Sequence, residues 1–253
     1  MDNSGQKLEK QAADLYSIAY ARSYKENDLE ALTNLNSMFV KSILSESFRN
    51  LESQRDHFGD KVRVLDIGCG TGRFFHCFDN NAIVTGLDVS LDMLEEARRP
   101  VGLSDNMMPD LNLIQGTLTS EFVSEHENAF DLIYSVGVYG AHAKYSNDIL
   151  DFCREMLKPN GIAIIDVTDI QTVVIARQKK WYGNLLRILL QLRLFEKLLR
   201  KLSPRLDKYV SSNTINNYCE QTLDAKSIAM EINNTKWSGK THFVYLQKIK
   251  RDR

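Results

Sequence analysis

The stretch that decides the fold runs from Val62 to Gly72 and reads VRVLDIGCGTG. Its first half is a short, mostly apolar run, which is typical of a buried strand, and its second half is rich in glycine. A glycine-rich loop between a strand and a helix lets a ligand approach the backbone near the positive end of the helix. The stretch therefore predicts a ligand-binding turn inside an α/β domain.

The glycine spacing excludes two common nucleotide-binding motifs. In the pattern G-x-G-x-x-G of nicotinamide enzymes the third glycine would fall on Arg73. The phosphate-binding pattern G-x-x-x-x-G-K-[ST] is absent as well. Instead an acid, Asp66, stands two residues before the G-x-G-x-G run that begins at Gly68.

Outward from this stretch, apolar strands alternate with helices. A helix is expected at 71–79, a second at 90–99 with Ser90 as its N-cap, and a third at 147–157. Strands are expected at residues 62–67, 82–88, 111–115, 130–136 and 162–167. Apolar strands that alternate with helices indicate a parallel sheet covered on both faces.

The ends of the chain follow other patterns. Before Lys61 the sequence predicts two helices, the second starting after Asn27 with Asp28 as its N-cap. The chain closes with two expected strands, 227–232 and 242–249. We therefore predict an α/β fold: a Rossmann-like, seven-stranded, mostly parallel sheet with helices on both faces and a C-terminal antiparallel hairpin. The expected parts are an N-terminal helical arm (1–60), a ligand-binding core (61–170), a basic helical lid inserted after strand five (171–225) and C-terminal strands (226–253).

Four segments in the core resemble one known family. The run from Asp66 to Gly72 closely resembles the first motif of class I S-adenosylmethionine-dependent methyltransferases, and residues 86–94 (GLDVSLDML) resemble the second. Residues 130–133 (FDLI) resemble the family's fourth strand, and residues 156–161 (MLKPNG) the turn before its fifth, with Asn160 where glycine is more usual. The four segments occur in the family's order, so the resemblance implies S-adenosylmethionine as cofactor and methylation of a small molecule, as in biosynthesis.

The resemblance also implies which residues bind the cofactor. Asp88 would accept hydrogen bonds from both ribose hydroxyls, and Asp66 would help to orient the amino group. Thr117 stands where the family usually has an aspartate that reaches the adenine, so the backbone of Leu118 is the alternative donor or acceptor there. A tyrosine of the first helix, where Tyr16, Tyr20 and Tyr24 share a face, is expected near the cofactor, and we choose Tyr20. The remaining predicted contacts are Gly68, Cys69, Gly70, Gly72, Val89, Met93, Gly116, Ser135 and Val136.

The segment after the fourth strand is expected to line the acceptor site. Methyl transfer to a hydroxyl or protonated amine needs a group that takes a proton, and His142 is the leading candidate base. Tyr139 is expected to shape the acceptor pocket or bind the acceptor. The competing interpretations are a structural loop histidine and a packed tyrosine. Asp166 and Asp169 stand at the end of the expected fifth strand, at the sheet edge where open α/β sheets bind ligands. One of them is a candidate contact to the acceptor, and helix capping is the competing interpretation.

Composition limits the partners. The 32 Lys and Arg residues nearly equal the 33 Asp and Glu residues, so no nucleic-acid partner is expected. The four cysteines show no zinc spacing, and no metal site is predicted. The N-terminal residues lack the basic start and apolar run of a secretory signal, so we expect a cytoplasmic protein. Residues 176–205 are basic and leucine-rich, which suits a lid over the acceptor, a homodimer contact or association with a membrane surface.

Three other functions compete with small-molecule O- or N-methylation. The same site would also suit an enzyme that binds S-adenosylmethionine for different chemistry, or a non-catalytic binding partner or regulator. The polar residues His142 and Tyr139 on the acceptor side favour catalysis over regulation. An RNA or protein methyltransferase is disfavoured by the near-neutral charge.

Overall fold

The deciding stretch folds as predicted into a buried strand followed by a glycine turn. A computed structural model of the chain describes residues 18–31, 35–55, 60–103, 107–172, 201, 206, 208–222, 225–233 and 238–249. In this structure every residue of β1 (Val62–Ile67) except Arg63 is buried. Burial of consecutive residues means that both faces of the strand are covered.

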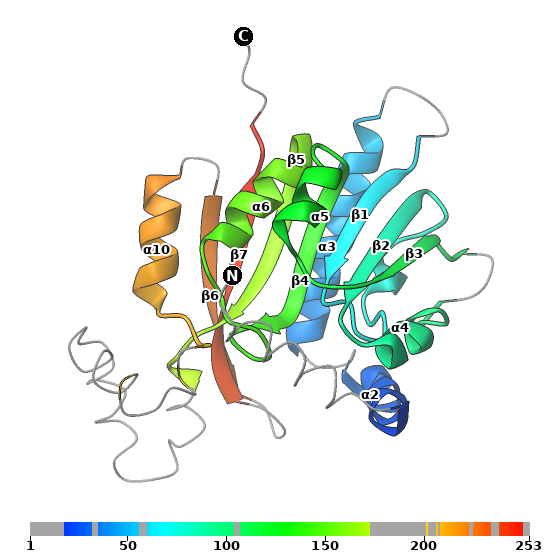
Figure 1. Cartoon of the computed structure of the whole chain (residues 1–253), viewed down its shortest axis with the longest axis horizontal. Coiled ribbons are helices and arrows are strands. Elements are labelled where there is room, and N and C mark those ends of the chain that lie inside the picture. Colours follow the sequence, from blue (N-terminus) through cyan, green and yellow to red (C-terminus); the bar gives the residue numbers. More distant parts are fainter. Residues whose placement is uncertain are drawn as a thin grey trace. The chain divides into compact units, whose positions relative to one another are not determined.

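Seven strands form a single sheet in the order β3-β2-β1-β4-β5-β7-β6 (Figure 1). β1 runs parallel to β2 and to β4, β2 runs parallel to β3, and β6 pairs with β7 in the antiparallel sense. The predicted fold class, including the antiparallel C-terminal hairpin, is therefore confirmed. The strands other than β1 are β2 (Ala82–Asp88), β3 (Asp110–Gln115), β4 (Phe130–Tyr139), β5 (Leu157–Thr168), β6 (Ala225–Asn233) and β7 (Ser238–Gln247).

The contacts divide the chain into two compact units, and β4 and β5 each contribute residues to both. The first unit comprises residues 1–135, 150–163 and 247–253, and the second comprises residues 136–149 and 164–246. The glycine turn and the strands β1, β2 and β3 belong to the first unit. The segment after β4, which was predicted to face the acceptor, belongs to the second.

In the first unit, helices pack on the three strands that precede β4. α3 (Leu35–Ser53) packs on β1, α4 (Leu91–Ala97) packs on β2 and β3, and α2 (Ile18–Ala31) packs against α4. The unit also holds α5 (Ser120–Glu125) and α6 (Asp148–Met156), the latter from residue 150 onward. As predicted, Ser90 caps α4, accepting a hydrogen bond from the Met93 N–H at 3.3 Å.

The helix predicted at 71–79 is wrong. Residues 71–74 form turns, and only a short 3₁₀ helix, η1 (Phe75–Cys77), follows. Gly72 has a φ of 74°, outside the helical region, and the N–H of Phe75 bonds the Gly72 carbonyl at 3.0 Å in the tighter i, i+3 pattern. Phe75 and Phe78, three residues apart, are both buried, so this geometry places two aromatic rings in the core.

The predicted helix start at Asp28 is also wrong. α2 continues through Asp28 to Ala31, and the Asn27 side chain bonds the Ser23 carbonyl at 2.7 Å one turn earlier. Asp28 is not an N-cap, because its carboxylate faces Thr71 and Arg73 instead of the backbone N–H groups of its own helix.

β5 begins earlier than the predicted strand at 162–167. The residues expected to form a turn before it already pair, since the Asn160 N–H bonds the Lys248 carbonyl at 2.7 Å and the Lys248 N–H bonds the Gly161 carbonyl at 2.9 Å. Asn160 has a φ of 66°, in the left-handed region that asparagine tolerates better than most residues. Asparagine is therefore a physically reasonable replacement for the usual glycine.

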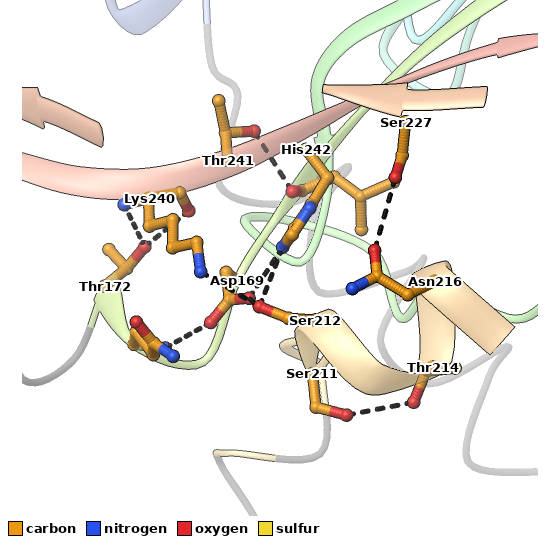
Figure 2. A network of polar contacts seen from close by, with 12 residues as sticks. Asp169, Thr172, Ser211, Ser212, Thr214, Asn216, Ser227, Lys240, Thr241 and His242 are labelled. Atoms are coloured by element: carbon orange, nitrogen blue, oxygen red, sulfur yellow. Dashed lines mark hydrogen bonds and ion pairs between the residues drawn. The ribbon is translucent and has the colours of Figure 1, made fainter. Parts of the chain in front are cut away.

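In the second unit, a buried polar network joins the end of β5 to β7 and to α10 (Ser212–Gln221), as Figure 2 shows. Asp169 Oδ2 accepts hydrogen bonds from Ser212 Oγ at 2.6 Å and from His242 Nε2 at 2.7 Å. Lys240 Nζ donates to Ser212 Oγ at 3.0 Å. Burial alone would raise the pKa of Asp169, but the hydrogen bonds from His242 and Ser212 outweigh it and lower that pKa.

Two predicted features lie outside the described residues. The first helix before Ile18, with Tyr16, is one, and the basic insertion at 176–205, of which only Lys201 is described, is the other. Within the ranges given above, no helix has the length and apolar character needed to cross a membrane.

Candidate cofactor site

The glycine turn follows β1 in the first unit and depends on left-handed backbone. Gly68, Gly70 and Gly72 have φ angles of 72°, 54° and 74°. The N–H groups of Gly68 and Cys69 donate to the Leu87 carbonyl at 2.7 and 3.1 Å, which fixes the turn to β2.

Gly70 and Gly72 of this turn serve different purposes. A Cβ built on Gly72 would lie 2.7 Å from the Phe75 ring, so packing requires glycine there. A Cβ on Gly70 would meet nothing within 4 Å, so the space above Gly70 is open. An open backbone with its N–H groups at the carboxyl end of a strand is where a ligand can approach closely.

Asp88 ends β2 and is fixed by backbone donors on both of its oxygens. Oδ2 accepts from the Gly70 N–H at 2.9 Å, and Oδ1 accepts from the Ser90 N–H at 2.9 Å. The carboxylate is half-buried. The residue predicted to bind the ribose is therefore pre-oriented beside the glycine turn.

Asp66 lies in β1, almost fully buried, next to the Tyr134 hydroxyl. Burial raises the pKa of Asp66 to about 8; the Tyr134 hydroxyl opposes this shift and the neighbouring Asp88 carboxylate adds to it. At neutral pH the Asp66 carboxyl is therefore mainly protonated, and a cation brought close to it would favour its ionised form.

The residues predicted to surround the adenine gather at the ends of β2 and β3. The Gly116 N–H bonds the Asp88 carbonyl at 2.9 Å, and the Gln115 side chain bonds the Val89 carbonyl at 3.1 Å. Met93 is buried, whereas Val89, Thr117 and Leu118 are half-buried. Apolar side chains and partly exposed backbone thus line this edge, as an adenine ring requires.

Ser135, which was predicted to contact the cofactor, belongs to the first unit and makes a structural contact there. Its side chain is fully buried, and its hydroxyl donates to the Ile67 carbonyl at 2.8 Å. Ser135 therefore ties β4 to the end of β1 just before the glycine turn. Val136, the next residue, is half-buried and belongs to the second unit.

Two residues of this region were missed from the sequence. Asp28, fully buried in α2, accepts a hydrogen bond from Thr71 Oγ1 and pairs with Arg73 Nε at 2.5 Å. The Arg73 guanidinium also lies over the Tyr24 ring, 5.1 Å from its centroid. The available signal was spacing, because Asp28 continues the four-residue repeat of Tyr20 and Tyr24 along one helix face.

Of the tyrosines on α2, the predicted Tyr20 is the more exposed. Its side chain is 44% exposed and stacks on Tyr24, with ring centroids 6.0 Å apart. Tyr24 contacts the guanidinium of Arg73 next to the glycine turn. Tyr20 stays a prediction as a cofactor contact.

In the second unit, β4 ends at Tyr139, and the tight turn that follows carries His142. The His142 N–H bonds the Val138 carbonyl at 2.8 Å, and the His142 side chain is exposed. Tyr139 is buried and packs edge-on against Tyr145, with ring centroids 6.3 Å apart. Lys208 Nζ donates to the Ala141 carbonyl at 2.6 Å and holds the turn from outside.

Asp166 supports the start of this same segment. Its carboxylate accepts a hydrogen bond from the Gly137 N–H at 3.1 Å and another from the Thr241 hydroxyl. Burial raises the pKa of Asp166 to about 6, and both hydrogen bonds oppose that shift. Asp166 and Asp169 thus both bind backbone and side-chain donors of their own unit. In the part of the chain that the structure describes, no cluster of His, Cys, Asp or Glu could hold a metal ion.

This geometry defines an α/β protein with a ligand-binding edge at the carboxyl ends of β1 and β2. A family model described as a methyltransferase domain matches residues 64–161, which include most of β1, the glycine turn and β2. Over these residues the chain is therefore similar to methyltransferase domains, in agreement with the resemblance of its four core segments to class I S-adenosylmethionine-dependent methyltransferases.

Individual relatives agree with the family match. A malonyl-[acyl-carrier protein] O-methyltransferase of Halalkalibacterium halodurans is 31% identical over 118 residues, covering 45% of this chain and 41% of its own. A ubiquinone biosynthesis O-methyltransferase of Histophilus somni is 29% identical over 101 residues, covering 40% and 42%. The chain thus spans about two fifths of the length of these curated relatives.

A solved structure has a similar fold. Magnesium protoporphyrin IX methyltransferase of Synechocystis PCC 6803, crystallised with bound S-adenosylhomocysteine, superposes with a TM-score of 0.52. The match covers 95% of this chain and 99% of that one at 12% identity, so it speaks for the fold alone.

Proposed function

We propose that this protein transfers the methyl group of S-adenosylmethionine to an oxygen of a small-molecule acceptor and releases S-adenosylhomocysteine. The observation that carries the proposal is the Asp88 carboxylate, oriented by the backbone N–H groups of Gly70 and Ser90 at the end of β2. A carboxylate in this place suits the paired hydroxyls of a ribose.

The first unit fits the rest of the cofactor. The open space above Gly70 suits the methionine part, since nothing lies within 4 Å of a Cβ built there. Asp66, whose buried carboxyl has a pKa of about 8, suits a cationic ligand, because a nearby positive charge favours its ionised form. Val89 and Met93 offer apolar surface to an adenine ring.

The choice of oxygen over nitrogen follows the named relatives, both of which are O-methyltransferases. Nitrogen is the alternative acceptor atom.

S-adenosylmethionine supplies an electrophilic methyl group, so the protein must mainly position the acceptor and, for a hydroxyl, take its proton. We assign proton removal to His142, whose exposed imidazole stands on a turn held by the Val138 carbonyl and by Lys208. We assign shaping of the acceptor pocket to Tyr139.

The test has two stages. Calorimetry of the purified protein should show binding of S-adenosylmethionine and S-adenosylhomocysteine but not of NAD⁺. A panel of carboxylic acids, phenols and amines, including a malonyl thioester, should then contain an acceptor that releases S-adenosylhomocysteine. Binding of NAD⁺ in preference to S-adenosylmethionine would overturn the proposal. Tight binding with no release from any acceptor class would favour a non-catalytic regulator.

A further inference from the structure

Asp28 joins the N-terminal helix α2 to the glycine turn through two contacts on either side of Gly72. One oxygen of its carboxylate binds the Thr71 hydroxyl, and the other pairs with Arg73 Nε at 2.5 Å. The side chain of Asp28 is fully buried and that of Arg73 is 25% exposed. Both partners of Asp28 belong to the turn that the family uses to hold its cofactor.

A buried carboxylate needs partners, and Asp28 has two. Arg73 in turn obtains an opposite charge from Asp28, because the Tyr24 ring that its guanidinium also faces attracts a cation but carries no net charge. The charge of Arg73 also reaches the base of the turn, where it lowers the pKa of Asp66 and so opposes the effect of burial.

We propose that Asp28 is a positioning residue for the cofactor: it holds α2 on the glycine turn and balances the charge of Arg73, so that the turn accepts a positively charged sulfonium compound. This inference rests on the proposed function, because it requires that the turn bind S-adenosylmethionine. Without Asp28, the uncompensated Arg73 would repel S-adenosylmethionine, which carries a sulfonium charge, more than S-adenosylhomocysteine, which does not.

Because the two ligands differ in charge, comparing their affinities distinguishes a charge-balancing role of Asp28 from a purely structural one. The Asp28→Asn variant keeps the shape and a hydrogen-bond acceptor for Thr71 but removes the charge. Its dissociation constant for S-adenosylmethionine should rise about tenfold, and that for S-adenosylhomocysteine about threefold or less, as expected for one unit charge at intermediate distance in a partly solvated site. Calorimetry with both ligands on each variant measures this.

The chain offers a matched control. Lys25 also fixes α2, since its Nζ bonds both the carbonyl and the carboxylate of Glu96 at 2.9 Å, and these contacts join α2 to α4 and not to the glycine turn. Lys25→Met should therefore leave the ratio of the two dissociation constants unchanged. If Lys25→Met shifts this ratio as Asp28→Asn does, general docking of α2 explains the effect and the inference is wrong.

Removal of Arg73 tests the charge argument with the opposite sign and covers the case in which Asp28→Asn does not fold. Arg73→Gln should favour S-adenosylmethionine over S-adenosylhomocysteine relative to the unmodified protein, and the double variant should restore the original ratio. Equal losses for both ligands, or no loss, in Asp28→Asn would overturn the inference and leave the proposed function intact. Absence of binding of either ligand to the unmodified protein would instead overturn the proposed function.

Discussion

The turn between β1 and β2 and the segment after β4 are stabilised by different kinds of contact. At the turn, Asp88 binds the N–H groups of Gly70 and Ser90, which lie 18 and two residues away in sequence. At the end of β5, Asp166, which holds the Gly137 N–H of β4, and Asp169 depend on Thr241 and His242, which lie 75 and 73 residues away. The predicted cofactor site thus depends mostly on local backbone geometry, whereas the predicted acceptor segment depends on side chains of β7.

This contrast predicts that substitutions in the two regions separate binding from turnover. The largest effect is expected on the acceptor side. His142→Ala should lower kcat for a hydroxyl acceptor by 100-fold to about 10,000-fold, because a positioned base contributes about this much. Affinity for S-adenosylmethionine, measured by calorimetry, should stay the same. Unchanged turnover would exclude His142 as the base, and Tyr139→Phe serves as the control for the neighbouring side chain.

Asp88→Ala should, in contrast to His142→Ala, change the affinity for S-adenosylmethionine. Loss of one or two charge-assisted hydrogen bonds to a ribose should weaken binding of S-adenosylmethionine by about 2–4 kcal/mol. Calorimetry measures the loss, and a thermal melt without ligand shows whether the turn itself still forms. An unchanged dissociation constant would contradict the ribose assignment.

Two glycines with nearly the same backbone angle sharpen the comparison through packing. Gly72 and Gly137 have φ angles of 74° and 76°, but a Cβ on Gly72 would lie 2.7 Å from Phe75, whereas one on Gly137 would meet nothing within 4 Å. Gly137→Ala should therefore cost only the backbone strain, about 1 kcal/mol, and Gly72→Ala about 2–3 kcal/mol. Chemical denaturation measures both, and equal losses would mean that Phe75 moves aside at little cost.

The last prediction concerns the pH dependence of stability. Burial raises the pKa of Asp66 to about 8 in the folded protein, so the folded chain holds a proton that the unfolded chain releases above about pH 4. The contribution of Asp66 to stability is therefore largest at low pH and is lost as the pH rises toward 8. Between pH 6 and pH 7 the loss is about 1.4 kcal/mol.

Asp66→Asn provides the comparison for this pH dependence, since the amide resembles the protonated carboxyl and does not titrate. Denaturation at pH 6 and pH 7 should show a shallower fall in the free energy of unfolding for the variant than for the unmodified protein. Parallel pH dependences would show that Asp66 is ionised in the folded state.

Most of the sheet followed from the sequence, and the errors have identifiable causes. The helix expected at 71–79 is absent because Gly72 adopts a left-handed φ, and Phe75 and Phe78 are buried in the shorter η1 geometry. Asp28 has the composition and position of an N-cap, but its carboxylate is bound by Thr71 and Arg73, over forty residues away. Propensity describes neighbours in sequence, and such distant partners override it.

The amino-acid sequence by itself determined the strand-turn-strand unit from Val62 to Asp88 and its resemblance to class I S-adenosylmethionine-dependent methyltransferases. It could do so because glycine φ angles and a carboxylate at a strand end are satisfied by nearby backbone. Only the tertiary structure decided that Asp28 fixes α2 to the glycine turn and that His242 is buried against Asp169. These pairs form because folding brings distant charged and polar groups out of water together, where each must find a partner.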